Sequence, residues 1–202
     1  HRWIAVVIAQ PQTVASYVLV AVSQTSDPFG TWDFGAYRTD SSGVLWADYP
    51  SVGYNHNWFV VAVNMFTVSG NALSRSQFYV LNRTNLYAGA FNDGRILTLA
   101  NDASGVAGFE IPAVTLDDTQ TNLFLLQSVR TNFNTRLRLF SITGAIGSET
   151  LNTNLGYFVV STNDAWDFQP PNRIDFARQA GITNQIQTGD ARLQNVVYRN
   201  GS

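Results

Sequence analysis

Apolar and polar positions follow one another in short blocks along this chain. Residues 46–66 (WADYPSVGYNHNWFVVAVNMF) contain two apolar runs, 49–54 and 58–66, on either side of the polar tripeptide 55–57. A short polar stretch between two β-rich runs predicts a hairpin. The second run is aromatic and β-branched and has no helical spacing of polar residues, so it predicts a strand buried on both faces.

Similar blocks predict strands along the whole chain, and no segment predicts a convincing helix. The expected strands are residues 3–9, 17–23, 31–39, 48–54, 58–66, 77–81, 95–100, 108–116, 123–129, 136–143, 157–161 and 189–199. Residues 162–187 are the longest irregular segment, and loops of that length in compact domains are usually functional or interfacial. We therefore expect an all-β fold.

Internal repetition narrows the choice of all-β architecture. Residues 109–129 repeat the strand–turn–strand pattern of residues 48–66, and residues 190–200 repeat the first strand of each pair. Each pair leads into further strands, which is the four-stranded antiparallel unit of a β-propeller blade. The strands suffice for about three blades in a single domain, 1–202, or part of one. The blades are roughly 46–102, 105–161, and a shared blade from 1–40 with 189–202.

Closed propellers have about four to eight blades. We therefore expect this chain either to belong to a longer ring or to combine with other copies. In both cases open sheet edges would pair with a complementary strand, because unpaired edges promote association.

Composition excludes several classes of function. The net charge is −2 and all 12 basic residues are Arg, which argues against nucleic acid and against a polybasic membrane patch. No apolar run is long enough to insert into a membrane. Charged residues make up 13% of the chain, below the about 25% of typical domains. A surface of Asn, Gln, Thr and Ser favours an extracellular protein, and the absence of Cys excludes disulfides, thiol catalysis and thiolate metal sites.

Three segments carry a resemblance to a known group. WADYPSVG…WFVVAVNMF, the preceding SQTSDPFGTW and the later TGDARLQNVVYRNGS resemble large bacterial extracellular β-propeller proteins, mostly of unassigned function. The resemblance covers nearly the whole chain and implies that it is a fragment of a longer ring. Thr25, Asp27, Gly30 and Trp32 are similar to the Asp-box of sialidases, with the glycine one place late. That box is structural, so it does not imply sialidase activity.

Three carboxylates open predicted first strands: Asp48, Glu110 and Asp190. First strands of a propeller line its central channel, so these acids are the candidate catalytic residues if the protein is an enzyme. Paired carboxylates are what glycoside hydrolysis requires. The alternatives are that each accepts hydrogen bonds from neighbouring strands, or that together they hold Ca²⁺ or water.

Four aromatic residues are candidate ligand contacts: Trp166, Phe168, Trp46 and Tyr49. Trp166 and Phe168 lie in a segment with little apolar material to bury them, so we expect them to be exposed. No cofactor or metal site is predicted, although Ca²⁺ at an Asp-rich turn stays open.

Three functional hypotheses follow. The first is an extracellular binding or scaffold module for a glycan or protein, and the second is a glycoside hydrolase or other carbohydrate-active enzyme. The third is a structural subunit that assembles through its sheet edges.

Overall fold

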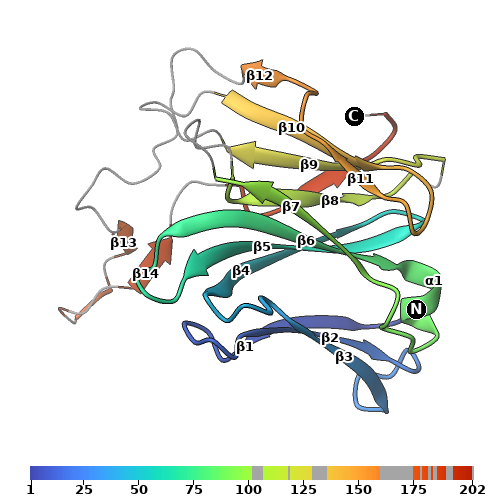
Figure 1. The fold of residues 1–202 in the computed structure, drawn as a ribbon, viewed down its shortest axis with the longest axis horizontal. Coiled ribbons are helices and arrows are strands. Elements are labelled where there is room, and N and C mark those ends of the chain that lie inside the picture. The colour runs from blue at the N-terminus through green and yellow to red at the C-terminus, as the bar shows by residue number, and fades with distance from the viewer. Residues whose placement is uncertain are drawn as a thin grey trace.

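A computed structural model describes residues 1–101, 107–117, 119–128, 136–159, 175–177, 179–181, 183, 186–189 and 193–201. The fold is all-β, as predicted, with a three-stranded sheet, a large barrel-like sheet that is nearly closed, and a separate hairpin (Figure 1). Within the described residues, no helix has the length and hydrophobicity needed to cross a bilayer.

The three-stranded sheet contains β1 (Ile4–Ala9), β2 (Tyr17–Ser23) and β3 (Trp32–Arg38). Its strands are antiparallel and follow one another in chain order. The β2–β3 turn is held by its own side chains: Asp27 Oδ1 accepts the Phe29 backbone N–H at 2.9 Å, and Trp32 Nε1 donates to the Pro28 carbonyl at 3.0 Å.

The next four strands are β4 (Leu45–Tyr54), β5 (Trp58–Thr67), β6 (Leu73–Asn82) and β7 (Arg95–Ala100), and each of β5, β6 and β7 pairs antiparallel with the strand before it. The predicted hairpin between β4 and β5 is confirmed. Asn55 Oδ1 stabilises its turn by accepting the backbone N–H groups of Asn57 and Trp58, both at 2.9 Å. The prediction that β5 is buried on both faces is also confirmed, because its first eight residues are all buried.

A short helix, α1 (Arg83–Tyr87), follows β6 and was not predicted. Asn82 caps it, because the Asn82 side chain accepts the backbone N–H groups of Thr84 and Asn85 at 2.9 and 3.4 Å. Five residues are too few to show a helical period of apolar positions, so only the cap residue could have signalled this helix.

The remaining strands of the large sheet are β8 (Glu110–Thr115), β9 (Leu123–Ser128), β10 (Arg136–Thr143), β11 (Thr150–Asn152) and β12 (Tyr157–Val159). Both β11 and β12 pair with β10. The sheet order is β11-β10-β9-β8-β4-β5-β6-β7, and β7 contacts β11, so the two ends of the sheet nearly meet.

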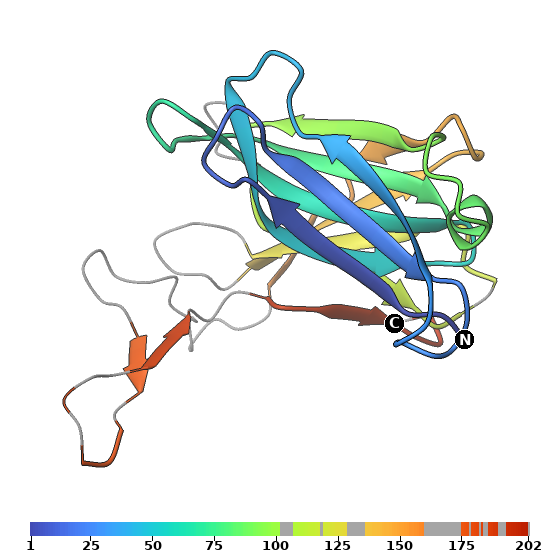
Figure 2. The same ribbon diagram turned by 90° about the horizontal axis from the view of Figure 1, so that it is seen from below.

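Separate four-stranded blades are not confirmed, because a parallel pairing of Tyr54 with Val114 joins β4 to β8. Gly53 permits this approach: a Cβ atom there would lie 2.5 Å from the carbonyl oxygens of Pro112 and Ala113. Strand β15 (Val196–Tyr198) also runs parallel to β8. Strands β13 (Asp175–Ala177) and β14 (Ile186–Gly189) form a hairpin that lies apart from the main body (Figure 2).

Two hydrophobic cores fill the spaces between these layers. In the first, Val18, Val20 and Val22 of β2 pack on the face of the β4–β6 sheet that carries Phe59 and Val61. In the second, Trp58 and Val60 from the opposite face of β5 pack against Leu125 of β9 and Phe140 of β10. Strand β5 therefore contributes to both cores, which accounts for its uniformly apolar sequence.

Candidate functional site

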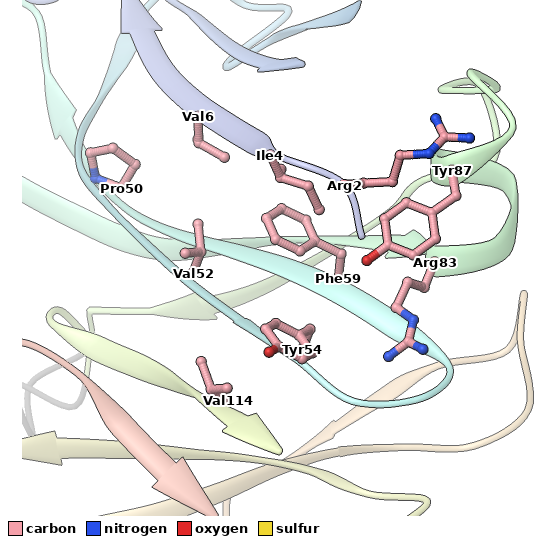
Figure 3. Close-up of a pocket in the computed structure, with 10 residues that line it drawn as sticks. All are labelled: Arg2, Ile4, Val6, Pro50, Val52, Tyr54, Phe59, Arg83, Tyr87 and Val114. Carbon is pink, nitrogen blue, oxygen red and sulfur yellow. The ribbon is translucent and has the colours of Figure 1, made fainter. Parts of the chain in front are cut away.

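A cleft between β1 and β4 is the first candidate site (Figure 3). Its volume is about 430 Å³, within the range of ligand-binding cavities. Ile4 and Val6 of β1 form one wall, and Pro50, Val52 and Tyr54 of β4 form the other. Both walls present every second residue of a strand. Because an extended peptide also projects alternate side chains to one side, the cleft has the spacing of a β-strand.

Two arginines gather at one end of this cleft, Arg2 before β1 and Arg83 at the start of α1, beside Tyr87 (Figure 3). Each guanidinium donates one hydrogen bond to a backbone carbonyl, Arg2 to Ser23 at 2.6 Å and Arg83 to Asn55 at 2.8 Å. In the described part of the chain, neither has a carboxylate within 4.0 Å. The cleft is therefore apolar along its length and positively charged at one end.

The outer edge of β1 adjoins the cleft. β1 pairs with β2 along its whole length, and no other described strand pairs with it. Its second edge consequently presents backbone N–H and C=O groups that can form hydrogen bonds with an added strand.

A second candidate site lies where β4, β8 and the segment before β15 meet. The Tyr49 hydroxyl donates to Gln194 Oε1 at 2.6 Å, and the Tyr49 ring lies edge-on to Phe109, with 6.1 Å between ring centroids. These residues are far apart in the sequence. Their convergence produces a surface with a half-exposed phenol, a second aromatic ring and a side-chain amide.

The backbone at this second site is strained. Tyr49 has φ of 53° and Phe109 has φ of 66°, the left-handed region that bulky side chains rarely adopt. Tyr49 lies in a β-bulge between Asp48 and Ser51, and Asn64 Oδ1 holds Phe109 by accepting its backbone N–H at 2.7 Å. Strain of this kind costs about 1–3 kcal/mol per residue and is concentrated at functional sites.

Glu110, next to Phe109, is buried within a network of hydrogen bonds. Ser76 Oγ donates to Glu110 Oε2 at 2.5 Å, while the Gly108 backbone N–H and Gln127 Nε2 donate to Oε1, each at 3.0 Å. Burial raises the pKa of Glu110 to about 7, although the hydrogen bonds from Ser76 and from the Gly108 backbone oppose the shift. Glu110 is therefore substantially protonated at neutral pH and has local partners for both oxygens.

The other predicted site residues are placed differently. Asp48 is exposed whereas Glu110 is only 3% exposed, so the two carboxylates occupy different environments. Trp46 is buried and packs against Phe66. Asp190, Trp166 and Phe168 lie outside the described residues.

Sequence reasoning missed several residues that build these sites. It did not single out Arg2, Arg83, Phe109, Gln127 or Gln194 for a site. Gly108 next to Phe109 was the available signal for an irregular backbone. The arginines offered none, because residues 2 and 83 meet only through the pairing of strands.

In the described ranges no three His, Asp or Glu side chains are grouped to hold an ion. Asp117 lies in one of the Asp-rich turns at which the sequence leaves Ca²⁺ open. Its carboxylate accepts the backbone N–H and the hydroxyl of Thr119, which lowers the pKa of Asp117. This carboxylate has local hydrogen-bond partners and serves the turn.

Comparisons of the chain with protein-family models, with curated proteins and with solved structures found no match.

Proposed function

We propose that this protein is an extracellular binding module that takes an extended, acidic segment of a protein ligand into the cleft between β1 and β4. The observation that carries the proposal is the cleft itself, which combines strand-spaced apolar walls with a strand edge and two arginines to which the described residues supply neither a strand partner nor a carboxylate. This is the chemistry of recognition by β-strand addition, in which backbone hydrogen bonds supply affinity and side-chain pockets supply specificity.

The position of the arginines sets the polarity of the ligand. Arg2 precedes the first residue of β1, so an added antiparallel strand would have its C-terminal end beside Arg2 and Arg83. The preferred ligand therefore carries apolar side chains at alternate positions and a carboxylate at its C-terminal end.

The arrangement of the strands supports a propeller-type architecture as part of the same proposal. β4 to β7 are four successive antiparallel strands, as are β8 to β11, and the first strands β4, β8 and β15 run parallel to one another. Extracellular propellers commonly serve as binding scaffolds, and the charge-poor composition is compatible with that location.

The proposal is tested with a fluorescent hexapeptide of alternating valine and threonine that ends in glutamate and is blocked at both termini. Fluorescence anisotropy should detect saturable binding to the wild-type protein. Arg83→Gln removes the charge-assisted hydrogen bond expected between this arginine and the glutamate carboxylate of the peptide. Such a bond is worth about 1.5 kcal/mol, so the variant should bind the peptide about tenfold more weakly. Arg2→Gln should have a similar effect.

The matched control is Arg95→Gln, which neutralises an exposed arginine of β7 that donates to the Gly147 carbonyl away from the cleft. This variant should bind like the wild type, and thermal melting should show that all variants fold. The proposal fails if the peptide does not bind, or if Arg95→Gln weakens binding as much as Arg83→Gln.

A second candidate function is glycan binding or hydrolysis at the Tyr49 site. The half-exposed Tyr49 ring beside Phe109 and the Gln194 amide is suited to stacking on a sugar. The raised pKa of Glu110 suits a general acid, although its burial separates it from a surface ligand. Calorimetry with soluble polysaccharides would favour this function if Tyr49→Ala abolished binding while Phe29→Ala, at an exposed ring of the β2–β3 turn, did not.

A further inference from the structure

The outer face of the β1–β3 sheet is apolar and largely exposed in the part of the chain that the structure describes. The register of the three strands places eleven residues on this outer face: Ala5, Val7, Ala9, Tyr17, Leu19, Ala21, Ser23, Trp32, Phe34, Ala36 and Arg38. Nine of the eleven are apolar or aromatic. Phe34 is 77% exposed and Val7 is 56% exposed, so large apolar side chains on this face contact solvent.

The strands of this sheet have the sequences of strands covered on both sides. β2 reads YVLVAVS, and its inner residues Val18, Val20 and Val22 are completely buried. The alternate residues Tyr17, Leu19 and Ala21 are equally apolar but only partly buried. A strand exposed on one face normally alternates apolar with polar residues. An apolar outer face therefore indicates a protein surface that packs against it.

We propose that the outer face of the β1–β3 sheet is a dimer interface, and that its occupant is the same face of a second copy of this chain. Among its eleven residues only Arg38, at one corner, is charged, so two copies can meet without burying like charges together. Apart from Arg38, this face offers no charged group to a charged partner.

The shape of the outer face also suits pairing with itself. Small and large residues alternate across it: Ala5 and Ala21 adjoin Phe34 in one row, and Val7 and Leu19 adjoin Ala36 in the next. Two such faces related by a two-fold axis can set large side chains of one copy against alanines of the other. Stacked sheets pack in this way about 10 Å apart.

The size of the face predicts a reversible dimer. Three strands of six or seven residues cover about 14 by 20 Å. Each face therefore measures about 280 Å² in projection and two faces about 560 Å², which is below the about 1,000 Å² of stable specific interfaces. We therefore expect a weak contact with a dissociation constant on the order of 100 µM, and no species larger than a dimer because a two-fold contact closes on itself.

Sedimentation velocity on the full chain, across concentrations up to about 200 µM, tests this inference. The wild type should shift with concentration from the 22.3 kDa monomer towards twice that mass. Phe34→Lys should remain monomeric, because it would bury two ammonium groups in an apolar contact.

The control is Phe29→Lys, which makes the same change at a 96% exposed phenylalanine in the adjacent turn. It should dimerise like the wild type, and circular dichroism should show that both variants fold. A wild type that stays monomeric at every concentration, species that grow beyond a dimer, or equal loss of association in the two variants would each overturn the inference.

Discussion

Glu110 is the residue at which burial has the clearest electrostatic consequence. The carboxyl group is enclosed by Ser76, Gly108 and Gln127, and burial moves its pKa from the ordinary value of 4.5 to about 7. In the unfolded chain the same group would titrate near 4.5. The folded state therefore binds more protons between these two pH values, and its stability depends on pH in that window.

We predict that the contribution of Glu110 to the free energy of unfolding is fully present below about pH 4.5 and is lost as the pH rises through 7. A shift of this size corresponds to about 3 kcal/mol. Glu110→Gln cannot titrate, so the stability of the wild type relative to this variant should fall by about that amount from pH 4 to pH 8. Urea unfolding at intervals of pH provides the measurement, and parallel curves for the two proteins would contradict the prediction.

Asp48 and Glu110 also show what a sequence pattern can and cannot tell about a site. The sequence predicts correctly that Asp48 and Glu110 lie in strands, β4 and β8. It does not predict that one is exposed and the other buried, because a β-bulge between Asp48 and Ser51 shifts the alternation of side chains. Such a bulge depends on the partner strand and is not encoded in local periodicity.

At the scale of elements, sequence alone could predict the strong strands but not the weak ones. β5 is recognisable because all its early residues are apolar, and the bounds of β2, β7 and β10 agree with the prediction. β6 begins four residues earlier than predicted, within a stretch that looks like a polar loop. β11 has only three residues, too few for a period of two to be visible.

The link between β4 and β8 is the element-scale feature that determines the architecture. It joins two groups of antiparallel strands into one nearly closed sheet. The sequence could not reveal it, because a pairing between two strands with three other strands between them in the chain leaves no local pattern. Only Gly53, an apparently unremarkable glycine within a strand, marked the close approach.

We predict that Gly53→Ala destabilises the protein by about 2 kcal/mol or more, because the new methyl group would overlap the backbone of Pro112 and Ala113. Gly70→Ala is the matched control, because the nearest atom to its added methyl group is Thr67 Oγ1 at 3.7 Å. This control should change stability by less than about 1 kcal/mol. Denaturant unfolding of both variants tests the pairing, and equal stability would show that β4 and β8 do not approach so closely.

At the scale of the whole molecule, the cleft of the binding proposal lies between two of three packed layers. The β1–β3 sheet packs on one face of β4–β6, and β9–β10 pack on the other. The cleft forms where the first two layers diverge, between β1 and β4. Its residues come from strands that are not neighbours in the sequence, so composition and motifs could not have identified it.

The central claim is that an acidic, extended segment binds along the free edge of β1. Amide hydrogen exchange with and without the Glu-ended hexapeptide tests it most directly. We expect slower exchange at those backbone amides of Ile4–Ala9 that do not donate to β2, and little change in β7 or around Tyr49. Protection confined to the Tyr49 site, or no protection of β1 at saturating peptide, would contradict the claim.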